Sequence, residues 1–239
     1  MIYISRFCFP CTEEETGFIM EEKRTCYDTF YPFRVLSKNC LSEIDFETVT
    51  ILYGSNGCGK TTALNVIAEK TGIRRDAPYN WTNFFEDYTD MCSFELADPV
   101  PEGSRVMTSD DVFNFMLDLR SINEGIDDKR DELIREHSNG ESAFIFFVNQ
   151  IKENALYLLD ESENSLSPSR QKELVKFLED SARFFGCQFI IATHSPFFLS
   201  MKGARIYDMD EDPVRVKKWT ELADVRAYYD FFAEHENEF

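Results

Sequence analysis

Residues 54–62 are Gly-Ser-Asn-Gly-Cys-Gly-Lys-Thr-Thr and match the pattern G-x-x-x-x-G-K-[ST]. The glycines let the backbone turn tightly, so that several N–H groups point at one anion. Lys60 places a cation against the β- and γ-phosphates of a nucleotide, and Thr61 offers its hydroxyl to Mg²⁺. The apolar run 48–53 predicts a strand before the loop, and residues 60–70 predict a helix after it. In this context the predicted phosphate-binding residues are Gly54, Asn56, Gly57, Cys58, Gly59, Lys60, Thr61 and Thr62.

A phosphate loop alone fits a kinase, a GTPase or a motor protein, so a second feature has to separate these classes. Asp160 and Glu161 follow the apolar run 155–159, where a parallel strand would open onto the nucleotide. Asp160 is suited to the magnesium shell, and Glu161 is suited to be the base that polarises the attacking water. The alternative is a helix-capping turn. Residues 162–167 separate the pair from the next helix, which favours the catalytic interpretation.

A histidine ends another predicted strand. His194 follows the run 188–193 and precedes Ser195 and Pro196. At the carboxyl end of a parallel strand it would lie on the ligand side of the sheet, where it could donate a hydrogen bond to the γ-phosphate or the attacking water. A lone histidine is more often structural, but a shared edge with the phosphate loop and the acidic pair favours a catalytic role.

Strand and helix patterns alternate along the whole chain, which predicts an α/β fold with a mostly parallel sheet flanked by helices. We expect an antiparallel portion at the N-terminus or at the edge of the sheet. Residues 204–209 and 214–216 are expected to be closing strands. The prediction is a single domain over 1–239, with 1–70 and 154–239 as the core and about 71–153 as an inserted, largely helical lobe. Helices are expected at 109–119, 126–136, 142–152, from Pro168 onward, and at 222–234.

The net charge of −19 and the pI near 4.5 bear on partners. Such a chain would repel a nucleic-acid backbone at long range, so nucleic-acid binding would need a local basic patch. No apolar run approaches the roughly 18 residues that span a bilayer, and no signal-peptide pattern opens the chain, so we expect a cytoplasmic protein without membrane insertion.

The seven cysteines are expected to be reduced thiols. Their number is odd, and one of them lies inside the phosphate loop. A zinc site is the alternative, because Cys8 and Cys11 form a C-x-x-C pair. The next two, Cys26 and Cys40, lack metal-ligand spacing.

Together these features resemble the ATP-binding-cassette superfamily, in the non-transporter branch that includes the SMC-like repair ATPases. The resemblance implies ATP and Mg²⁺ as ligands, a Walker A loop at 54–62, a Walker B strand at 156–161 and a D-loop at 162–167. It also implies a signature motif of the type Ser-x-Gly-Gln/Glu at a helix N-terminus. The matching residues are Ser138, Gly140 and Glu141.

Two departures from that family are visible. The Gln that usually lies between Walker A and the signature has no counterpart between Lys60 and Ser138; Ser109, Asp110 or Asp111 are candidates for its place. The segment between Lys60 and Ser138 is also too short for a coiled-coil arm. The chain therefore resembles a head without arms, as in short bacterial ATPases labelled "AAA family", many of which lie in anti-phage defence or other mobile-element operons.

The leading hypothesis is an ATP-driven switch. Two chains would close head-to-tail over two ATP molecules, each signature serving the partner chain's γ-phosphate, and reopen after hydrolysis. The switch would control an effector protein encoded nearby, in phage defence or a DNA-related process. The alternatives are the ATPase subunit of a membrane transporter and an ATP sensor with negligible turnover. The sequence does not identify the effector.

Overall fold

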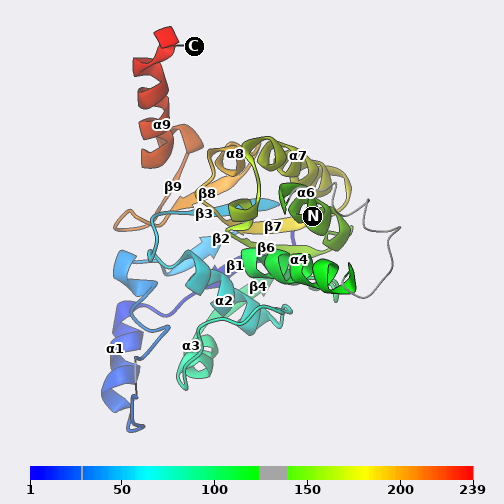
Figure 1. The fold of residues 1–239 in the computed structure, drawn as a ribbon. Coiled ribbons are helices and arrows are strands. Elements are labelled where there is room, and N and C mark those ends of the chain that lie inside the picture. Colours follow the sequence, from blue (N-terminus) through cyan, green and yellow to red (C-terminus); the bar gives the residue numbers. More distant parts are fainter. Residues whose placement is uncertain (28, 124–138, 239) are drawn as a thin grey trace.

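The computed structural model describes residues 1–27, 29–123 and 139–238. At its centre lies a six-stranded sheet in the order β5-β6-β7-β3-β8-β9 (Figure 1). All pairs in this sheet are parallel except β8 with β9, which is antiparallel. The strands are β3 (Val49–Tyr53), β5 (Arg105–Thr108), β6 (Leu156–Asp160), β7 (Gln188–Ala192), β8 (Arg205–Asp208) and β9 (Arg215–Lys217). The mostly parallel sheet and the antiparallel closing strand are confirmed.

A second, antiparallel sheet of three strands covers one face of the first. Its order is β2-β1-β4, with bounds Glu43–Asp45, Ile4–Cys8 and Ser93–Leu96. The buried Gln188 on β7 joins the two sheets, because its carboxamide accepts from the Tyr3 and Ile4 N–H groups and donates to the Ile4 carbonyl. The predicted antiparallel N-terminal portion is this sheet.

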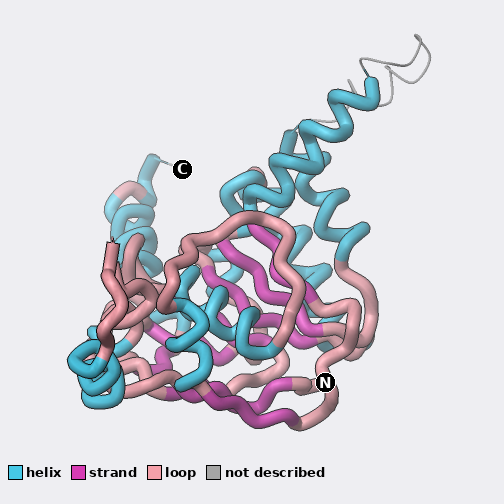
Figure 2. Tube along the Cα trace, turned by 90° about the horizontal axis from the view of Figure 1, so that it is seen from below, coloured by secondary structure: helices cyan, strands magenta, loops and turns pink. Residues whose placement is uncertain are grey.

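Helices occupy both faces of the central sheet (Figures 1 and 2). The helix α2 lies on the side of the smaller sheet, and α6, α7 and α8 lie on the other. The helices are α1 (Thr12–Glu21), α2 (Lys60–Thr71), α3 (Phe85–Met91), α4 (Ser109–Asn123), α6 (Asn139–Gln150), α7 (Pro168–Phe184), α8 (Pro196–Leu199) and α9 (Ala223–Glu234). Short 3₁₀ turns are Ser37–Asn39, Ser162–Ser165, Trp219–Glu221 and Glu236–Glu238. The predicted helix at 126–136 lies outside the described residues.

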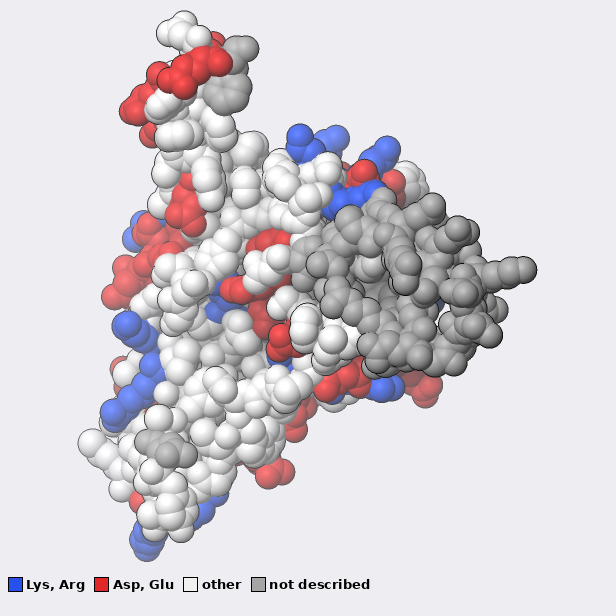
Figure 3. All heavy atoms as spheres, viewed as in Figure 1, with Lys and Arg blue, Asp and Glu red and all other residues white. Residues whose placement is uncertain are grey.

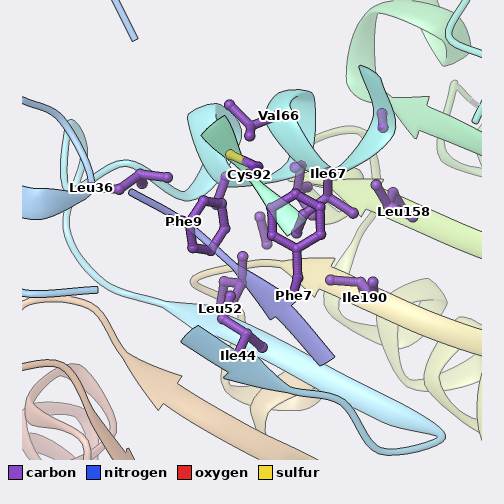
Figure 4. Packing of buried hydrophobic residues seen from close by; sticks show 14 of the residues in the cluster. Phe7, Phe9, Leu36, Ile44, Leu52, Val66, Ile67, Cys92, Leu158 and Ile190 are labelled. Carbon is purple, nitrogen blue, oxygen red and sulfur yellow. The ribbon is translucent and has the colours of Figure 1, made fainter. Parts of the chain in front are cut away.

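The central strands are buried on both faces, as parallel strands usually are. On β3, Leu52 points to one core and Ile51 to the other; on β7, Ile190 and Ile191 divide in the same way. Figure 4 shows the first core, in which Phe7 of β1 and Phe9, just after this strand, lie between helix α2 and the sheet. A phosphate loop that joins β3 to α2 is therefore fixed at both ends by buried elements.

The segment 71–153 contains helices, as predicted, but it also contributes strands. β4 pairs with β1 in the smaller sheet, and β5 forms the edge of the central sheet beside β6. Before β4, Arg74 forms a parallel bridge with Arg105 of β5, and the Arg74 carbonyl accepts from the Val106 N–H at 2.8 Å. The first half of the predicted insertion therefore contributes one strand to each sheet. The sequence at 71–107 does not indicate these strands. It is irregular and contains prolines, and each strand is only four residues long.

Candidate functional site

Four strand ends meet at the carboxyl edge of the central sheet. β3 leads into the loop 54–59, β6 ends at Asp160, β7 leads to His194, and β5 ends at Thr108. Because these strands are parallel neighbours, their following residues converge at one edge. The arrangement brings together the phosphate loop, the acidic pair and the histidine, although Lys60 and His194 are 134 residues apart in the sequence.

The loop depends on its glycines. Gly59 has φ +108°, in the left-handed region, and a Cβ there would approach Leu36 to 2.9 Å. Gly54 has φ +149°, and its Cβ would lie 2.7 Å from the Cys58 sulfur. A side chain at either position would strain the backbone and clash. The Cys58 side chain is half-buried and packs against the hydrophobic core.

Lys60 begins helix α2, and its side chain is only 4% exposed. The ammonium group donates to the carbonyls of Gly54 at 2.7 Å and Ser55 at 3.2 Å, and it lies 2.8 Å from Nε2 of His194. Within the described part of the chain, no carboxylate forms an ion pair with it. A buried cation with only neutral partners is suited to bind an anion at the helix N-terminus.

Thr61 and Asp160 supply two adjacent oxygen atoms. The Thr61 hydroxyl donates to the Asp160 carboxylate at 3.0 Å. Burial raises the pKa of Asp160 to about 6, and the hydrogen bond from Thr61 opposes this rise. A hydroxyl and a carboxylate are the hard ligands that Mg²⁺ uses when phosphates and water complete its shell. This pair therefore fits the predicted magnesium site.

Glu161 occupies a strained position directly after β6. Its backbone is left-handed, with φ 48° and ψ 40°, which is uncommon for a residue other than glycine. One carboxylate oxygen lies 3.6 Å from Nε2 of His194, and the other accepts from the Asn164 side chain at 3.0 Å. The turn thus directs the carboxylate toward His194 and the end of Lys60.

The main-chain position of His194 is held by a residue that sequence reasoning missed. Glu163 is buried, and its Oε1 accepts from the Thr193 hydroxyl at 2.5 Å and from the backbone N–H groups of His194 at 2.8 Å and Ser195 at 3.3 Å. One carboxylate oxygen thereby fixes three consecutive residues. The only signal for Glu163 in the sequence is that an acidic residue lies two positions after Glu161. Its role depends on β7, which begins 25 residues later.

Two cavities adjoin these residues and share Tyr31, Thr61, Thr62 and Glu161 in their linings. One, of about 500 Å³, is lined by Asn56, Gly57, Gly59, Lys60 and Val35 in addition to the shared residues. The other, of about 290 Å³, opens beside Asp160. The Tyr31 hydroxyl donates to the Thr62 hydroxyl at 3.2 Å, so Tyr31 lies beside the end of the phosphate loop. No pattern in the amino-acid sequence singles out this tyrosine.

Arg75, which no motif in the sequence singles out, also lines the smaller cavity. Its guanidinium donates to the Asn65 side chain and to the Ala77 carbonyl, and it lies over the Tyr79 ring. Ser109 and Asp110 line the same cavity, whereas Asp111 accepts from the backbone and hydroxyl of Thr108. Of the three candidates for the missing Gln, Ser109 and Asp110 are therefore near the acidic pair, and Asp111 caps a helix.

The signature residues are described only in part. Ser138 lies outside the described residues, and Gly140 and Glu141 fall in the first turn of α6. Their backbone therefore belongs to a helix N-terminus, which is the element that the prediction requires.

Two other sequence-level expectations concern metals and membranes. Across residues 1–27, 29–123 and 139–238, no group of three or more His, Cys, Asp or Glu side chains is arranged to hold a metal ion. In the same ranges, no helix has the length and apolar character needed to cross a bilayer. All seven cysteines are free thiols.

Comparison with known sequences identifies a family. The family described as "AAA domain, putative AbiEii toxin, Type IV TA system" matches residues 69–200, which is more than half of the chain. The matched segment includes Asp160, Glu161, Glu163 and His194. The chain belongs to this family. Its fold, with the phosphate loop between β3 and α2, is that of a P-loop NTPase, as predicted. No curated protein matches this member of the AAA-domain family.

Solved structures with a similar fold have low sequence identity to this AAA-domain chain. The SMC head domain from Thermotoga maritima has a TM-score of 0.48 and 14% identity, covering 91% of this chain and 99% of that one. A bacterial ABC transporter cassette in its dimeric form has a TM-score of 0.43 and 13% identity, covering 75% and 90%. An SMC head bound to the C-winged helix domain of ScpA has a TM-score of 0.44 and 13% identity, covering 77% and 94%.

Proposed function

We propose that this protein binds Mg-ATP and hydrolyses it, and that two copies pair head-to-tail over the nucleotides as a switch for a partner protein. The observation that carries the proposal is the meeting of Lys60, Glu161 and His194 at the carboxyl edge of the sheet. The Lys60 ammonium lies 2.8 Å from Nε2 of His194, and a Glu161 carboxylate oxygen lies 3.6 Å from the same nitrogen. A cation for the phosphates, a carboxylate base and an imidazole gathered in this way are the groups that water attack on a γ-phosphate requires.

Each residue has a distinct task in this proposal. The loop N–H groups and Lys60 hold the phosphates, and Thr61 with Asp160 would hold Mg²⁺, which neutralises charge on the phosphates when bound. Glu161 orients the attacking water and accepts its proton. His194 fixes the position of Glu161 or the γ-phosphate, and Glu163 fixes His194 through its backbone.

Control of a partner protein is supported by analogy. The family description names a toxin of a type IV toxin–antitoxin system, which suits a two-component arrangement such as the phage-defence or DNA-related role expected from the sequence. The free thiols suit a reducing compartment such as the cytoplasm.

The test is the Glu161→Gln variant. An amide can position water but cannot accept its proton, so we expect phosphate release to fall by about 10²-fold to 10⁴-fold while ATP affinity stays close to that of the wild type. Glu153→Gln, at an exposed position, is the matched control and should retain full turnover. Size-exclusion chromatography with Mg-ATP should show the Glu161→Gln protein accumulating as a dimer.

Two outcomes would separate the alternatives. Full turnover in Glu161→Gln would move the base to another residue. ATP binding by the wild type without measurable phosphate release, alone or with a partner, would leave an ATP sensor instead of a hydrolase.

A further inference from the structure

An acidic turn lies beside the phosphate loop. It spans residues 209–214, joins β8 to β9, and contains the consecutive acidic residues Asp210, Glu211 and Asp212. Figure 3 shows red side chains at the left edge of the molecule, where Figure 1 places this turn. A carboxylate near the phosphates of a nucleotide repels them, so an acidic residue at this position has to contribute something that offsets the repulsion.

The strand order brings this turn to the phosphate loop. β8 runs parallel to β3, with Asp208 in register with Tyr53, so the residues that follow the two strands lie side by side. The Met209 N–H donates to the Tyr53 carbonyl at 2.8 Å and continues the pairing. Asp210 is thereby placed against Ser55, which lies 155 residues earlier in the sequence.

One carboxylate binds both donors of Ser55. Oδ2 of Asp210 accepts from the Ser55 backbone N–H at 2.7 Å, and Oδ1 accepts from the Ser55 hydroxyl at 2.7 Å. Gly54 leaves room for this contact, because a Cβ there would lie 3.2 Å from Oδ1 of Asp210. Among the residues that the structure describes, no basic side chain forms an ion pair with Asp210. The hydrogen bonds of its carboxylate are therefore made with the phosphate loop.

The peptide group between Gly54 and Ser55 connects Asp210 to Lys60. Its N–H donates to Asp210, and its carbonyl, which is that of Gly54, accepts from the Lys60 ammonium at 2.7 Å. In a trans peptide the N–H and C=O point in opposite directions, so the two charged side chains bind opposite ends of one planar unit. The carboxylate also polarises the peptide and strengthens the hydrogen bond at its carbonyl. Fixing this peptide plane therefore fixes the carbonyl that holds Lys60.

The turn itself is held on both sides. Asp208 is 4% exposed, and one oxygen of its carboxylate accepts from the Asp210 N–H at 3.2 Å, while the other binds Lys217 at 2.9 Å. The Asn39 side chain donates to the Met209 carbonyl at 2.6 Å. A turn that is fixed in this way can order a glycine-rich loop beside it.

We infer that Asp210 is a positioning residue of the nucleotide site, which acts through the Gly54–Ser55 peptide to hold Lys60 and the phosphate loop ready for phosphates. The effect on ATP binding rests on the proposed function, whereas the link from Asp210 to Lys60 does not. Without this link, the nucleotide itself would have to order the loop, which lowers its affinity. Once ATP is bound, its phosphates hold the loop, so turnover at saturation should change little.

The first experiment tests the link without nucleotide. Mass spectrometry compares the wild-type chain with Asp210→Ala in two properties. These are the amide hydrogen exchange of residues 54–59 and the acetylation of Lys60 by acetic anhydride, with the exposed Lys38 as internal reference. We expect both to be faster in Asp210→Ala, by severalfold to about tenfold, because a hydrogen bond to a charged group is lost. Asp212→Ala removes a carboxylate from the same turn and should behave like the wild type.

The second experiment measures Mg-ATP affinity by calorimetric titration and phosphate release at saturating ATP. Asp210→Ala should bind Mg-ATP about tenfold more weakly, while its turnover at saturation stays within about twofold of the wild type. Asp210→Asn retains an acceptor oxygen and should recover most of the affinity. Ser55→Ala removes the hydroxyl but keeps the peptide N–H, so it should lose much less affinity than Asp210→Ala. A merely structural role would instead lower the melting temperature and the active fraction and leave the KM for ATP unchanged.

Several results would overturn the inference. Unchanged loop exchange and Lys60 acetylation in Asp210→Ala would remove the link. Tighter ATP binding by this variant would make repulsion the main effect of Asp210, and an equal effect of Asp212→Ala would assign it to the charge of the turn. An equal loss in Ser55→Ala would assign the effect to the hydroxyl. A wild type that binds no Mg-ATP would contradict the proposed function instead, and the first experiment would still decide whether Asp210 holds Lys60.

Discussion

Among single residues, Glu163 connects the turn after β6 to residues 193–195, which follow β7. We expect Glu163→Ala to lower ATP turnover by roughly tenfold to a hundredfold with little change in ATP affinity, because the displaced His194 misaligns the reacting groups. Three donors lose their acceptor in this variant, so its melting temperature should also fall. Phosphate release, ATP binding and thermal unfolding measure the three effects.

A purely structural role for Glu163 can be distinguished from a positioning role. Glu163→Gln retains an acceptor oxygen and should recover most of the turnover. Glu179→Gln on α7, another carboxylate that accepts from a backbone N–H, is the control and should leave turnover unchanged. If Glu163→Ala lowered ATP affinity and ATP turnover by the same factor, the role of Glu163 would be to stabilise the fold and not to position His194.

Cys58 offers a chemical test of the loop. Burial raises the pKa of its thiol, so less of the reactive thiolate is present at neutral pH than in an ordinary cysteine. We expect iodoacetamide to react slowly at pH 7 and faster as the pH rises past the ordinary value of 9, to block ATP binding, and to be excluded by bound ATP. Inhibition that persists in Cys58→Ser would assign the effect to another thiol.

Helix α1 contains the clearest pH-dependent element outside the site. Burial raises the pKa of Glu15, against opposition from hydrogen bonds that its carboxylate accepts from Ser37 and the Arg34 backbone. A folded-state pKa above the unfolded value means that the folded protein binds more protons. The contribution of Glu15 to stability is therefore greatest below pH 4.5 and is lost as the pH rises through the folded pKa.

Glu15→Gln removes this titration. Relative to the wild type, its free energy of unfolding should increase between pH 4.5 and pH 8, because the variant carries no buried charge. Urea unfolding at several pH values measures the difference. Glu21→Gln, exposed at the end of the same helix, should follow the wild-type curve. Parallel curves for Glu15→Gln and the wild type would contradict the assignment.

The elements differ in how far the sequence predicts them. β3, β6 and β7 were predicted to within one or two residues, because uninterrupted apolar runs are typical of strands that are buried on both faces. β4 and β5 were not predicted. Each is short, and β4 is partly exposed, so neither has a pattern that its own residues reveal. Their pairing is set by β1 and β6, which are distant in the sequence.

At the scale of the whole molecule, the predictable part of the site is the part encoded in consecutive residues. The loop at 54–62, the Asp160–Glu161 pair and His194 follow from local patterns, and the parallel sheet brings them together. Tyr31 and Arg75 come from irregular segments whose position depends on tertiary packing. Gly140 lies in the first turn of α6. The proposed contribution of Ser138 to the site of a partner chain can be tested only with two copies of the chain.

The head-to-tail arrangement gives that test. If Ser138 and the N-terminus of α6 bind the γ-phosphate held by a partner chain, Ser138→Arg should leave ATP binding to each monomer intact. It should abolish turnover and ATP-dependent dimerisation, because the larger side chain would fill the γ-phosphate pocket. ATP titration, phosphate release and size-exclusion chromatography measure these properties separately.

Mixing two inactive variants makes the outcome sharper. Lys60→Ala removes the cation that faces the phosphates, so this variant alone should bind ATP weakly and stay inactive. A mixed dimer of Ser138→Arg and Lys60→Ala chains joins one intact phosphate loop to one intact signature. It can therefore recover up to one working site, visible as turnover that rises when the two proteins are combined. If the two sites are strictly coupled, the mixture stays inactive, and the result for Ser138→Arg alone then tests the head-to-tail dimer. Normal dimerisation and turnover in Ser138→Arg would rule out this dimer.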